Sequence, residues 1–495
     1  MGGRTTNYLA FDLGGSGGKL QLCRFDGERL SLEEVRRFDN EPVAANGCLY
    51  WDLWNIHREL DRGIRKAATI AGGPIRSIGL DSFSNDFSFI DKRGELLAPL
   101  RCYRDGRTER YKDAIYAKMS KERLYGLTGN QVAPFNTLMQ LAAMREAGQG
   151  FMLDHAYKLL FTPDLLIHFM TGEAASEYTM ASVSQMFDFA ARDWNDEILE
   201  AFSIPRRLLC PIAESGTVVG RTRKEWNRES GSGGLDVVSV CEHDTASAFL
   251  AAASEGDRAI ISSGTWSLVG AEVPSPVIGD FGFRHNIANE GGFGNRHRLI
   301  RNVMGLWIIQ ELARQYEERG ESCRFAELEA AAAAAPPFAH RLDPDDPLFF
   351  SPPDMEEAIV RRCGERGGSA PRTAGETVRC VLEGLAFKYR WAVEKIEAVA
   401  LRPLPSVHVV GGGSRNALLC QFTANSCGRP VLSGPSDATA LGNILVQLVA
   451  DRRIASIEEG QELIRTSFPA KEYLPRETAL WDEKYAVFKE TFALE

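Results

Sequence analysis

The sequence predicts an α/β protein that contains two large domains of related plan. The first observation is length, because 495 residues exceed what one hydrophobic core usually serves. The second is the alternation of short apolar runs with longer runs of helical periodicity. The third is a pattern that occurs at residues 8–25 and again at 259–272, in which two apolar strands flank a turn of glycine or small polar residues. This repeat predicts an internal duplication, with domains at 1–245 and 246–495.

Composition and charge narrow the functional classes. Hydrophobic residues make up 44% of the chain and charged residues 25%, which is typical of a globular protein with a sizeable core. The net charge of −10 argues against nucleic acid or an anionic membrane surface as a binding partner. It does not argue against a small anionic ligand, which needs only local amides and one or two cations.

The cysteines and the first residues of the chain predict its compartment. The ten cysteines are scattered, with no CxxC pair and no spacing to histidine that indicates a metal site. The sequence does not start with an apolar signal core, and no run reaches transmembrane length. We therefore expect free thiols in a cytoplasmic protein that is a monomer or a homodimer.

Periodicity and turn residues place the elements of the first half. An amphipathic helix is predicted over 54–71 and a buried strand over 75–83. Residues 160–172 predict a short helix that ends at Gly172. Residues 216–234 are rich in glycine, serine, arginine and glutamate, which predicts a surface connection.

Glycine and proline mark most element boundaries of the second half. Helices are predicted over 302–320, 326–337, 376–400 and 438–451, with a further one from about residue 416. Strands are predicted over 406–413 and 429–434. The helix over 376–400 carries an apolar stripe that we expect to be core, formed by Val378, Leu382, Leu385, Tyr389, Val393 and Ile396.

Three ionisable residues interrupt an apolar stretch at the centre of the chain. In "VVSVCEHDTASAF" (237–249), a predicted buried strand stops at Glu242-His243-Asp244 and a predicted helix follows at once. One explanation is a helix start with Asp244 as the N-cap, where the helix dipole favours an acid. The other is a functional acid at a strand end. Both remain open on these residues alone.

Three glycine-bearing turns, at 14–19, 262–265 and 411–413, provide candidate phosphate sites. Glycine lets backbone N–H groups approach phosphate oxygens, and Lys19 would add a positive charge. The Walker A pattern is absent and the first turn joins two strands, so P-loop and Rossmann interpretations fail. A tight hairpin explains one such turn without any ligand, whereas three turns, two of them in the duplicated pattern, favour phosphate binding.

With Asp244 placed between the two duplicated turns, the pattern resembles the FGGY carbohydrate kinases of the actin-like ATPase superfamily, and among them the rhamnulokinase-like branch. The resemblance covers nearly the whole chain. It is carried by "FDLGGSGGK" (11–19), "YRDGRT" (103–108), "PFNTLMQL" (134–141), "HDTASA" (243–248), "SSGTWSL" (262–268), "NEGG" (289–292), "NVMGLWIIQ" (302–310), "VVGGGSRNALL" (409–419) and "GNILVQL" (442–448).

The resemblance implies a fold and a reaction. The fold would be two duplicated actin-like (ribonuclease H-like) domains around a central cleft. The reaction would be ATP-dependent phosphorylation of a terminal hydroxyl of a ketose, with Mg²⁺ bridging the phosphates. L-rhamnulose is the leading candidate substrate, and another ketopentose, deoxyketohexose or ketotetrose is the alternative.

The resemblance also implies roles for individual residues. Asp244 corresponds to the catalytic base, which takes the proton from the attacking sugar hydroxyl, and Asp12 to the acid that faces the metal-bound phosphates. The positions implied to bind ATP are Gly15, Ser16, Gly17, Gly18, Lys19, Thr265, Gln310 and Gly412. The positions implied to bind the sugar are Ser84, His243, Asp244, Thr245 and Asn302. Because eight residues of helix span roughly 12 Å, a helix that contains Asn302 and Gln310 would serve both ligands.

The chain departs from the rhamnulokinase pattern in one segment. Where that branch carries Asp-Thr-Trp-Gly-Val-Asp-Phe, residues 81–87 are Asp-Ser-Phe-Ser-Asn-Asp-Phe. Phe83 replaces a larger tryptophan, and Ser84 replaces a glycine that contacts sugar in that branch. A site built for particular hydroxyls discriminates strongly, so this segment leaves the identity of the ketose open. At position 19 the branch often has arginine and this chain has Lys19. The lysine keeps the positive charge but cannot donate the two parallel hydrogen bonds that a guanidinium can.

Two functions from other classes are weighed against the kinase. An actin-like ATPase without kinase activity would use ATP to change shape, but the sugar-contact positions His243, Thr245 and Asn302 beside Asp244 argue against it. A metal-dependent sugar isomerase would need a cluster of histidines and acids around its ions, and the sequence contains no such pattern.

Overall fold

The computed structural model describes residues 5–230, 234–252, 257–321, 324–365 and 369–495. Contacts between residues divide the chain into two compact units. Unit 1 consists of Met1–Ala253, Glu272–Leu299 and Ala438–Ser467, and unit 2 of Ser254–Ala271, Ile300–Asp437 and Phe468–Glu495. Each unit combines segments that are distant in sequence, and the boundary at residue 245 stays a prediction.

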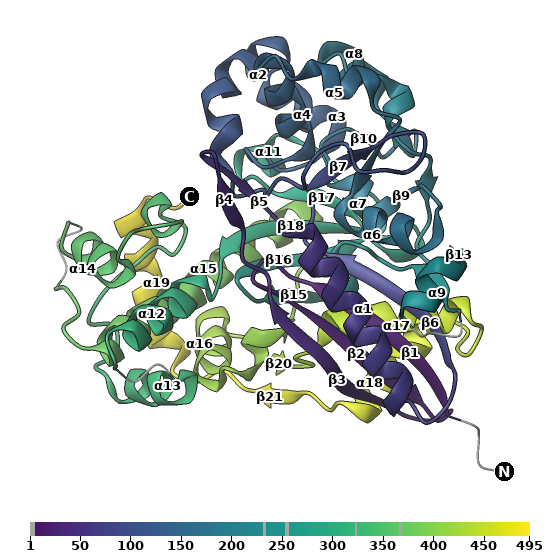
Figure 1. Cartoon of the computed structure of the whole chain (residues 1–495). Coiled ribbons are helices and arrows are strands. Elements are labelled where there is room, and N and C mark those ends of the chain that lie inside the picture. The colour runs from purple at the N-terminus through teal and green to yellow at the C-terminus, as the bar shows by residue number, and fades with distance from the viewer. Residues whose placement is uncertain (1–4, 231–233, 253–256, 322–323, 366–368) are drawn as a thin grey trace. The chain divides into compact units, whose positions relative to one another are not determined.

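Unit 1 is built on a six-stranded sheet of order β13-β14-β6-β1-β2-β3. Its strands are β1 (Thr6–Leu13), β2 (Gly17–Phe25), β3 (Leu30–Asp39), β6 (Ile75–Ser82), β13 (Thr217–Arg221) and β14 (Asp236–Ser239). Figure 1 shows β1, β2 and β3 as neighbouring purple arrows. The strands β1, β6 and β14 are parallel to one another, whereas β2, β3 and β13 run antiparallel to their neighbours. The carboxyl ends of the three parallel strands therefore meet at one edge of the sheet.

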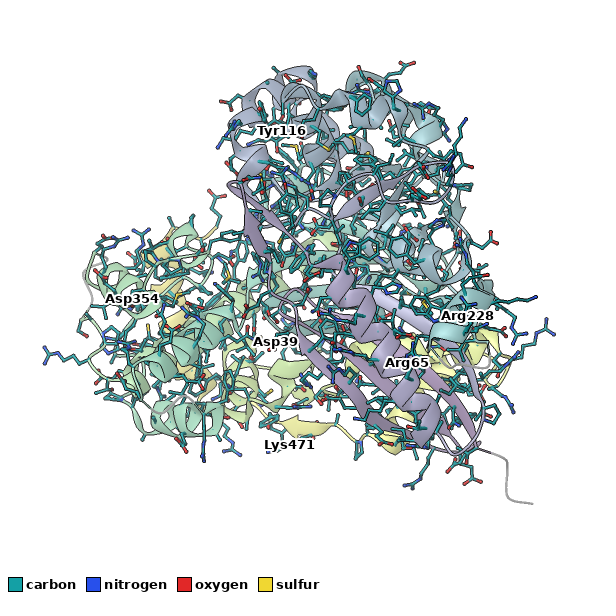
Figure 2. The ribbon with its side chains drawn as sticks, in the orientation of Figure 1. Asp39, Arg65, Tyr116, Arg228, Asp354 and Lys471 are labelled. Atoms are coloured by element: carbon teal, nitrogen blue, oxygen red, sulfur yellow. The ribbon has the colours of Figure 1, made fainter. Side chains whose placement is uncertain are left out.

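Helices cover both faces of this sheet. On one face, Gly63 of α1 (Leu53–Ile70) lies so close to Leu20 that a Cβ would come within 2.7 Å of it. On the other face, Gly79 of β6 is packed in the same way against Asn443 and Gln447 of α17 (Ala438–Ala450). Leu20 aligns with Leu80 through their common neighbour in β1, and successive residues of a strand point to opposite faces. The helices α1 and α17 therefore lie on opposite faces. Figure 2 shows charged side chains such as Arg65 on the outer side of α1.

The remaining elements of unit 1 include a separate core of buried apolar residues from the segment between residues 87 and 212. The helices of this segment are α2 (Lys112–Lys118), α3 (Lys121–Thr128), α4 (Thr137–Glu146), α5 (Gly150–His155), α6 (Thr162–Thr171), α7 (Tyr178–Ser182) and α8 (Asp196–Ala201). Its strands are β7 (Phe87–Ile90), β8 (Lys158–Phe161), β9 (Ser176–Glu177), β10 (Phe187–Asp188), β11 (Asp193–Trp194) and β12 (Ile212–Ala213). Elsewhere in unit 1 lie β4 (Val43–Ala45), β5 (Cys48–Tyr50), α9 (Lys224–Ser230), α10 (Asp244–Ala251), α11 (Asp280–Arg284), β17 (Ala288–Gly291) and α18 (Ile457–Ser467).

Unit 2 repeats the plan of the first sheet. Its strands belong to a seven-stranded sheet of order β17-β18-β16-β15-β19-β20-β21. After β17, these are β15 (Arg258–Ser263), β16 (Trp266–Val273), β18 (His297–Met304), β19 (Ser406–Val410), β20 (Val431–Ser433) and β21 (Lys471–Tyr473). The hairpin β15-β16 is antiparallel, β15, β19 and β20 are parallel, and β21 is antiparallel to β20. The same relations hold for β1-β2, for β1, β6 and β14, and for β13. The predicted duplication is confirmed.

The helices of unit 2 agree with the sequence pattern in most places. They are α12 (Trp307–Glu318), α13 (Phe325–Ala334), α14 (Met355–Glu365), α15 (Ala374–Ala400), α16 (Ala417–Cys427) and α19 (Thr478–Phe492). The whole apolar stripe predicted for 376–400 is buried in α15. Asn416 is the N-cap of α16, where its side chain accepts a hydrogen bond from the Leu419 backbone N–H.

Two sequence predictions were wrong. Residues 216–234 are not simply a surface connection, because they form β13, which pairs with β14, and α9; residues 231–233 lie outside the described residues. The helix predicted over 302–320 begins only at Trp307, because residues 302–304 complete strand β18. Asn302 and Gln310 therefore lie on different elements, and no single helix carries both.

The nine described cysteines are free thiols, and Cys323 lies outside the described residues. None of the helices in the described part of the chain has both the length and the apolar content needed to cross a membrane.

Candidate active site

The edge of the unit 1 sheet gathers three carboxylates. Asp12 at the end of β1 aligns with Asp81 at the end of β6, and the backbone N–H of Ser82 donates to the Glu242 carbonyl at 2.8 Å. This contact places the residues after β14, which include Asp244, beside the end of β6. The ends of parallel strands are where open α/β sheets bind their ligands.

Asp244 is the first residue of α10, and His243 is the N-cap. Of the two explanations left open by the sequence, the one with Asp244 as the N-cap is therefore wrong. Its Oδ1 instead accepts hydrogen bonds from the backbone N–H and the hydroxyl of Thr245, at 2.5 and 3.1 Å. The packing around the carboxyl group, together with the nearby Asp12 carboxylate, raises the pKa of Asp244 to about 7. Its side chain remains 29% exposed, so it can be reached by a ligand.

Asp81 lies beneath this edge and is fully buried. The side-chain amide of Asn443 donates to its Oδ2 at 2.6 Å, which fixes the orientation of the carboxyl group. Burial raises the pKa of Asp81 well above its usual value, and the charges of Asp12 and Asp244 add to this. The carboxyl groups at this edge therefore repel one another when ionised, and a bound cation would relieve that repulsion.

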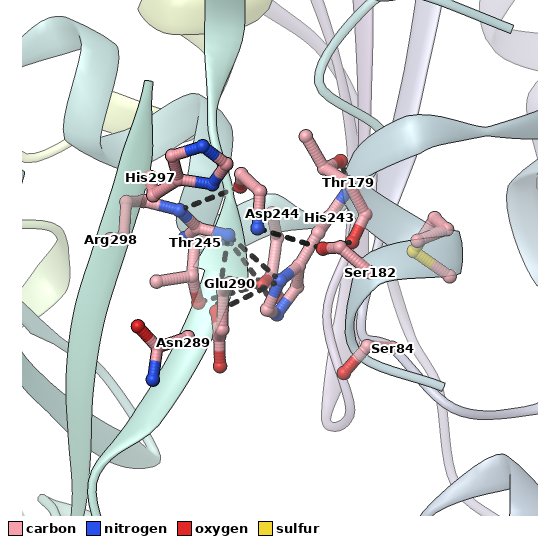
Figure 3. A network of polar contacts seen from close by, with 12 residues as sticks. Ser84, Thr179, Ser182, His243, Asp244, Thr245, Asn289, Glu290, His297 and Arg298 are labelled. Atoms are coloured by element: carbon pink, nitrogen blue, oxygen red, sulfur yellow. Dashed lines mark hydrogen bonds and ion pairs between the residues drawn. The ribbon is translucent and has the colours of Figure 1, made fainter. Parts of the chain in front are cut away.

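His243 lies within a buried polar network (Figure 3). Its Nδ1 is 3.4 Å from Nη2 of Arg298 and 3.5 Å from Oε2 of Glu290, and its Nε2 is 3.6 Å from Oδ1 of Asp244. Arg298 and Glu290 form an ion pair of 3.1 Å. Burial and the adjacent Arg298 charge lower the pKa of His243 well below its usual range, so the imidazole is neutral.

Glu177 fixes the backbone of the segment that carries Asp244. Its Oε2 accepts hydrogen bonds from the Thr179 hydroxyl at 2.5 Å and from the Glu242 backbone N–H at 3.3 Å. The Thr179 hydroxyl oxygen in turn accepts from the backbone N–H of His243 at 3.1 Å. The segment 242–243 is thus held to α7 through one buried carboxylate.

Glu242, the first of the three ionisable residues, is buried and does not reach the surface. It accepts a hydrogen bond from the Ser239 hydroxyl at 2.9 Å and shares a side-chain hydrogen bond with Asp164. Burial, and the negative charges of Asp164 and Glu177, raise its pKa well above the usual value. Its position indicates a structural role below the site.

The first glycine turn joins β1 to β2, where Lys19 is the cross-strand partner of Asp12. The Gly14 backbone N–H donates to the Gly17 carbonyl at 2.8 Å, which closes the turn. Gly18 has a packing reason to be glycine, because a Cβ there would lie 2.2 Å from the Phe38 ring. A Cβ at Gly15 would meet the Tyr103 hydroxyl at 2.8 Å. Close packing thus explains part of this turn, and its ATP contacts stay a prediction.

Unit 2 brings together three of the residues predicted to bind the nucleotide. The Thr265 hydroxyl lies 3.3 Å from Oε1 of Gln310, and α12 begins against the same turn, since the Leu306 backbone N–H donates to the Gly264 carbonyl at 2.9 Å. The third glycine turn packs on β15, where a Cβ at Gly413 would lie 2.0 Å from the Ser263 hydroxyl oxygen. Gly412 differs, because a Cβ there would meet nothing within 4 Å. That open space leaves room for a ligand.

Asn302 lies on β18, in unit 2. Its backbone carbonyl accepts a hydrogen bond from Nη1 of Arg301 at 2.7 Å. Its side-chain Oδ1 is shielded from solvent and has no hydrogen-bond partner among the described residues. A ligand hydroxyl would satisfy this atom.

Within the segment that departs from the rhamnulokinase pattern, Ser84 is the partly exposed residue and the others of 81–87 are buried. Its hydroxyl accepts from Asn85 Nδ2 at 2.9 Å. Phe83 is only 7% exposed and packs against Trp51, with ring centroids 4.7 Å apart, and against Tyr103 at 5.8 Å. Ser84 therefore has access to a ligand, whereas Phe83 shapes the site from the core.

Sequence reasoning missed several residues that the structure places around Asp244. Glu290 was quoted within the "NEGG" stretch without a role, and Arg298 and Glu177 were not singled out. Each is distant in sequence from Asp244, so no local spacing could have shown the contact. Asp81 had a signal, because an acid at the end of a predicted buried strand repeats the position of Asp12.

Comparisons with known proteins show the family to which the chain belongs. Family models of the FGGY family of carbohydrate kinases match residues 7–251 with the N-terminal domain and residues 259–450 with the C-terminal domain. The rhamnulokinase of Bacteroides thetaiotaomicron is 37% identical over 98% of this chain and 99% of its own length. The rhamnulokinase of Bacillus subtilis is 34% identical, over 95% of this chain and 96% of its own.

Solved structures show the fold. Xylulose kinase from Lactobacillus acidophilus, crystallised with a bound ligand, superposes with a TM-score of 0.82 at 17% identity over 99% of both chains. Plasmodium falciparum glycerol kinase with ADP superposes with a TM-score of 0.78 at 15% identity, over 99% of this chain and 98% of its own. At these identities the likeness concerns the fold alone, and it confirms the predicted duplicated α/β architecture.

Proposed function

Because this chain belongs to the FGGY family of carbohydrate kinases, we propose that it transfers the γ-phosphoryl group of ATP to the 1-hydroxyl of L-rhamnulose. The products would be L-rhamnulose 1-phosphate and ADP. The sugar is suggested by the relatives named rhamnulokinase, which match over nearly the full chain. The observation that carries the proposal is the accessible carboxylate of Asp244, which has a raised pKa and lies at the start of α10, just after the parallel strand β14.

Asp244 acts as the general base. Its carboxylate takes the proton of the sugar hydroxyl, the sugar oxygen forms a bond to the γ-phosphorus, and the bond from that phosphorus to the bridging oxygen of ADP breaks. A base is most efficient when its pKa lies near the working pH, and the pKa of about 7 meets this condition. Phosphoryl transfer needs positioning and charge stabilisation more than covalent help, so one placed carboxylate is sufficient.

A Mg²⁺ ion bound with the nucleotide would supply positive charge to offset the charge of the phosphates. Asp12 is the residue that would hold it, since its carboxylate lies in the charge environment of both Asp81 and Asp244. In the part of the chain that the structure describes, no three histidine, cysteine or acidic side chains form a group that could hold a metal by themselves. A Mg²⁺ ion that keeps most of its ligands from phosphate and water fits such a setting.

The nucleotide and the sugar contact different sets of residues. In this proposal the phosphates are bound by Gly15, Ser16, Gly17, Gly18 and Lys19, and the rest of the nucleotide by Thr265, Gln310 and Gly412. Support comes from the contact between Thr265 and Gln310 and from the open space at Gly412. The sugar contacts Ser84, His243, Thr245 and Asn302.

The accessible hydroxyl of Ser84 favours a second candidate substrate. It adds a hydroxyl at the one accessible position of its segment, so a ketose with a different hydroxyl pattern, such as a ketopentose or a ketotetrose, is the alternative. The cytoplasmic location and the monomeric or homodimeric state stay predictions.

A screen of ADP release tests the proposal. The purified full chain is assayed with ATP and Mg²⁺ against L-rhamnulose and a panel of ketopentoses, deoxyketohexoses and ketotetroses. We expect the highest kcat/KM with L-rhamnulose. A higher value with another ketose would replace the substrate and keep the kinase, whereas ATP turnover that no sugar increases would contradict the kinase and point to an ATPase.

A further inference from the structure

Arg298 occupies a position that is costly for a charged side chain. Its side chain is 0% exposed, and its Nη1 has no hydrogen-bond partner among the described residues. Its Nε donates to the Gly291 carbonyl at 3.0 Å, and Glu290 lies at 3.1 Å. Replacing a buried ion pair by apolar residues of similar size is often neutral or stabilising. Stability alone therefore does not account for this pair.

The guanidinium dictates which nitrogen of His243 carries the hydrogen. A guanidinium has donors and no acceptor, so the 3.4 Å contact between its Nη2 and His243 Nδ1 requires a lone pair on Nδ1. A hydrogen on Nδ1 would oppose the Nη2 donor of Arg298, and Arg298 cannot become an acceptor. Glu290 Oε2 lies 3.5 Å from the same nitrogen and makes no hydrogen bond among the described residues. It is closer to Arg298 Nη2, at 3.1 Å, so its main electrostatic partner is the guanidinium and not the imidazole. The neutral imidazole thus carries its hydrogen on Nε2.

The tautomer matters because Nε2 is the nitrogen nearest to Asp244, at 3.6 Å from its Oδ1. An N–H on this side favours an ionised carboxylate, which can accept a proton from the substrate. A lone pair on this side would favour a protonated carboxyl group, which cannot act as a base. Such contacts often tighten only when substrate binds.

We propose that Arg298 and Glu290 are positioning residues that hold His243 in the Nε2–H tautomer and thereby keep Asp244 competent as a base. The inference rests on the proposed function, in which Asp244 takes the proton of the sugar hydroxyl. Arg298 orients the ring, and Glu290 balances the buried charge of Arg298 (Figure 3).

The charged groups around His243 define the expected effect of each substitution on its pKa. They are Arg298 and Glu290 from the adjacent strands and Asp244 on its own element, with Glu177 bonded to the neighbouring backbone. Burial is the larger cause of the lowered pKa of His243 and the Arg298 charge is the smaller one. Removal of Arg298 should therefore raise that pKa in part, while burial keeps it below the usual range. Removal of the Glu290 charge should lower it further.

Kinetics of four variants test the role. We expect Arg298→Met to lower kcat by about 10- to 100-fold, the range for residues that orient a functional imidazole, while KM for ATP stays unchanged. Glu290→Gln keeps the arginine donor and should lose less. Arg298→Met with Glu290→Met removes both charges, so it should fold well and remain slow. Arg296→Met is the matched control, because Arg296 is exposed and pairs with Glu272 and Glu458; it should retain wild-type kcat.

The double variant separates a positioning role from a structural one. If the pair serves only the fold, the variant without either charge should recover wild-type kcat, and this result would overturn the proposal. An unchanged kcat in Arg298→Met would also overturn it.

Nitrogen NMR of histidine-labelled protein gives a readout that does not need catalysis. In the wild type between pH 6 and 8, the His243 signals, assigned by their loss in His243→Gln, should show a neutral ring with hydrogen on Nε2. Arg298→Met should populate the Nδ1–H form. A wild-type ring that is cationic or carries its hydrogen on Nδ1 would contradict the inference even if the kinase reaction is correct. The expected spectrum in a protein that phosphorylates no sugar would refute only the proposed function.

Discussion

Asp244 imposes a cost on folding, and the raised pKa behind this cost is what the proposed role as a base requires. Its pKa rises from the ordinary 3.8 to about 7 in the folded chain because packing removes hydration and Asp12 adds a like charge. A raised pKa means that the ionised form is disfavoured in the folded state, so the penalty is absent below about pH 4 and complete above about pH 7. Sites that trade stability for function commonly show such groups.

Replacement of Asp244 by asparagine should separate catalysis from folding. Asp244→Asn keeps the size of the side chain and removes the base, so kcat should fall by roughly 10²-fold or more. The melting temperature at pH 8 should be equal to or higher than that of the wild type, because the penalty for the ionised group is removed. Asp196→Asn, at a position where the side chain is 76% exposed, is the control. Wild-type turnover in Asp244→Asn would exclude Asp244 as the base.

The pH dependence of the reaction follows from the same pKa. The base is active when ionised, so kcat/KM for the sugar should fall as the pH decreases through about 7, approaching about tenfold per unit at lower pH. Steady-state rates between pH 5.5 and 8.5, with stability checked at each pH, give the profile. A profile that is flat down to pH 5.5 would show that Asp244 does not limit the reaction.

At the scale of elements, the sequence predicts what local chemistry controls. The hairpins at 8–25 and 259–272 and the long helix α15 were predicted because strand alternation, glycine turns and helical periodicity act over short distances. The sequence predicts a helix at residues 302–304 because a short apolar run is compatible with both helical and strand periodicity. Only the pairing within the sheet shows that these residues belong to β18. Val218 of β13 is 50% exposed. This edge strand therefore lacks the alternation of buried and exposed side chains from which a strand is predicted.

The segment 81–87 should tune the choice of sugar through Ser84. Ser84→Gly removes the accessible hydroxyl and should shift the kcat/KM ratio toward L-rhamnulose over a ketopentose by about 1–3 kcal/mol. Phe83→Trp should instead lower the melting temperature, because the ring at 83 is packed between Trp51 and Tyr103 and overpacking costs roughly 1–3 kcal/mol. Measurement of kcat/KM for both sugars in wild type and Ser84→Gly decides this. An unchanged ratio would show that Ser84 does not select the sugar.

A substitution in the third glycine turn should weaken the binding of the nucleotide alone. In Gly412→Val the new side chain enters open space, so the fold should persist while the affinity for ATP falls by tenfold or more and sugar affinity is kept. Gly364→Val is the matched control, because its Cβ also meets nothing within 4 Å and it lies in α14. Calorimetry with ATP and with sugar separates the two ligands. Equal losses for both would mean that the turn supports the fold and not the nucleotide.

At the scale of the whole molecule, the duplicated hairpin was sufficient to predict two related sheets, and their strand orders agree. The return of α17 to the first sheet and the Asp81–Asn443 contact depend on segments more than 360 residues apart. The strand order also joins segments that are distant in sequence, and no local pattern encodes such pairings. The same applies to the site. Asp12 and Asp244 were predicted from their motifs, whereas Arg298, Glu290 and Glu177 became visible only when distant strands were placed together.

The most direct test of the account is the ratio of sugar phosphate to ADP formed by the wild-type chain. Purified protein is incubated with ATP, Mg²⁺ and L-rhamnulose, ADP is measured enzymatically, and the phosphorylated carbon is identified by phosphorus NMR. The account predicts one sugar 1-phosphate for each ADP, negligible ADP without sugar, and loss of both products in Asp244→Asn. ADP formation that proceeds at the same rate without sugar, or that continues in Asp244→Asn, would contradict it.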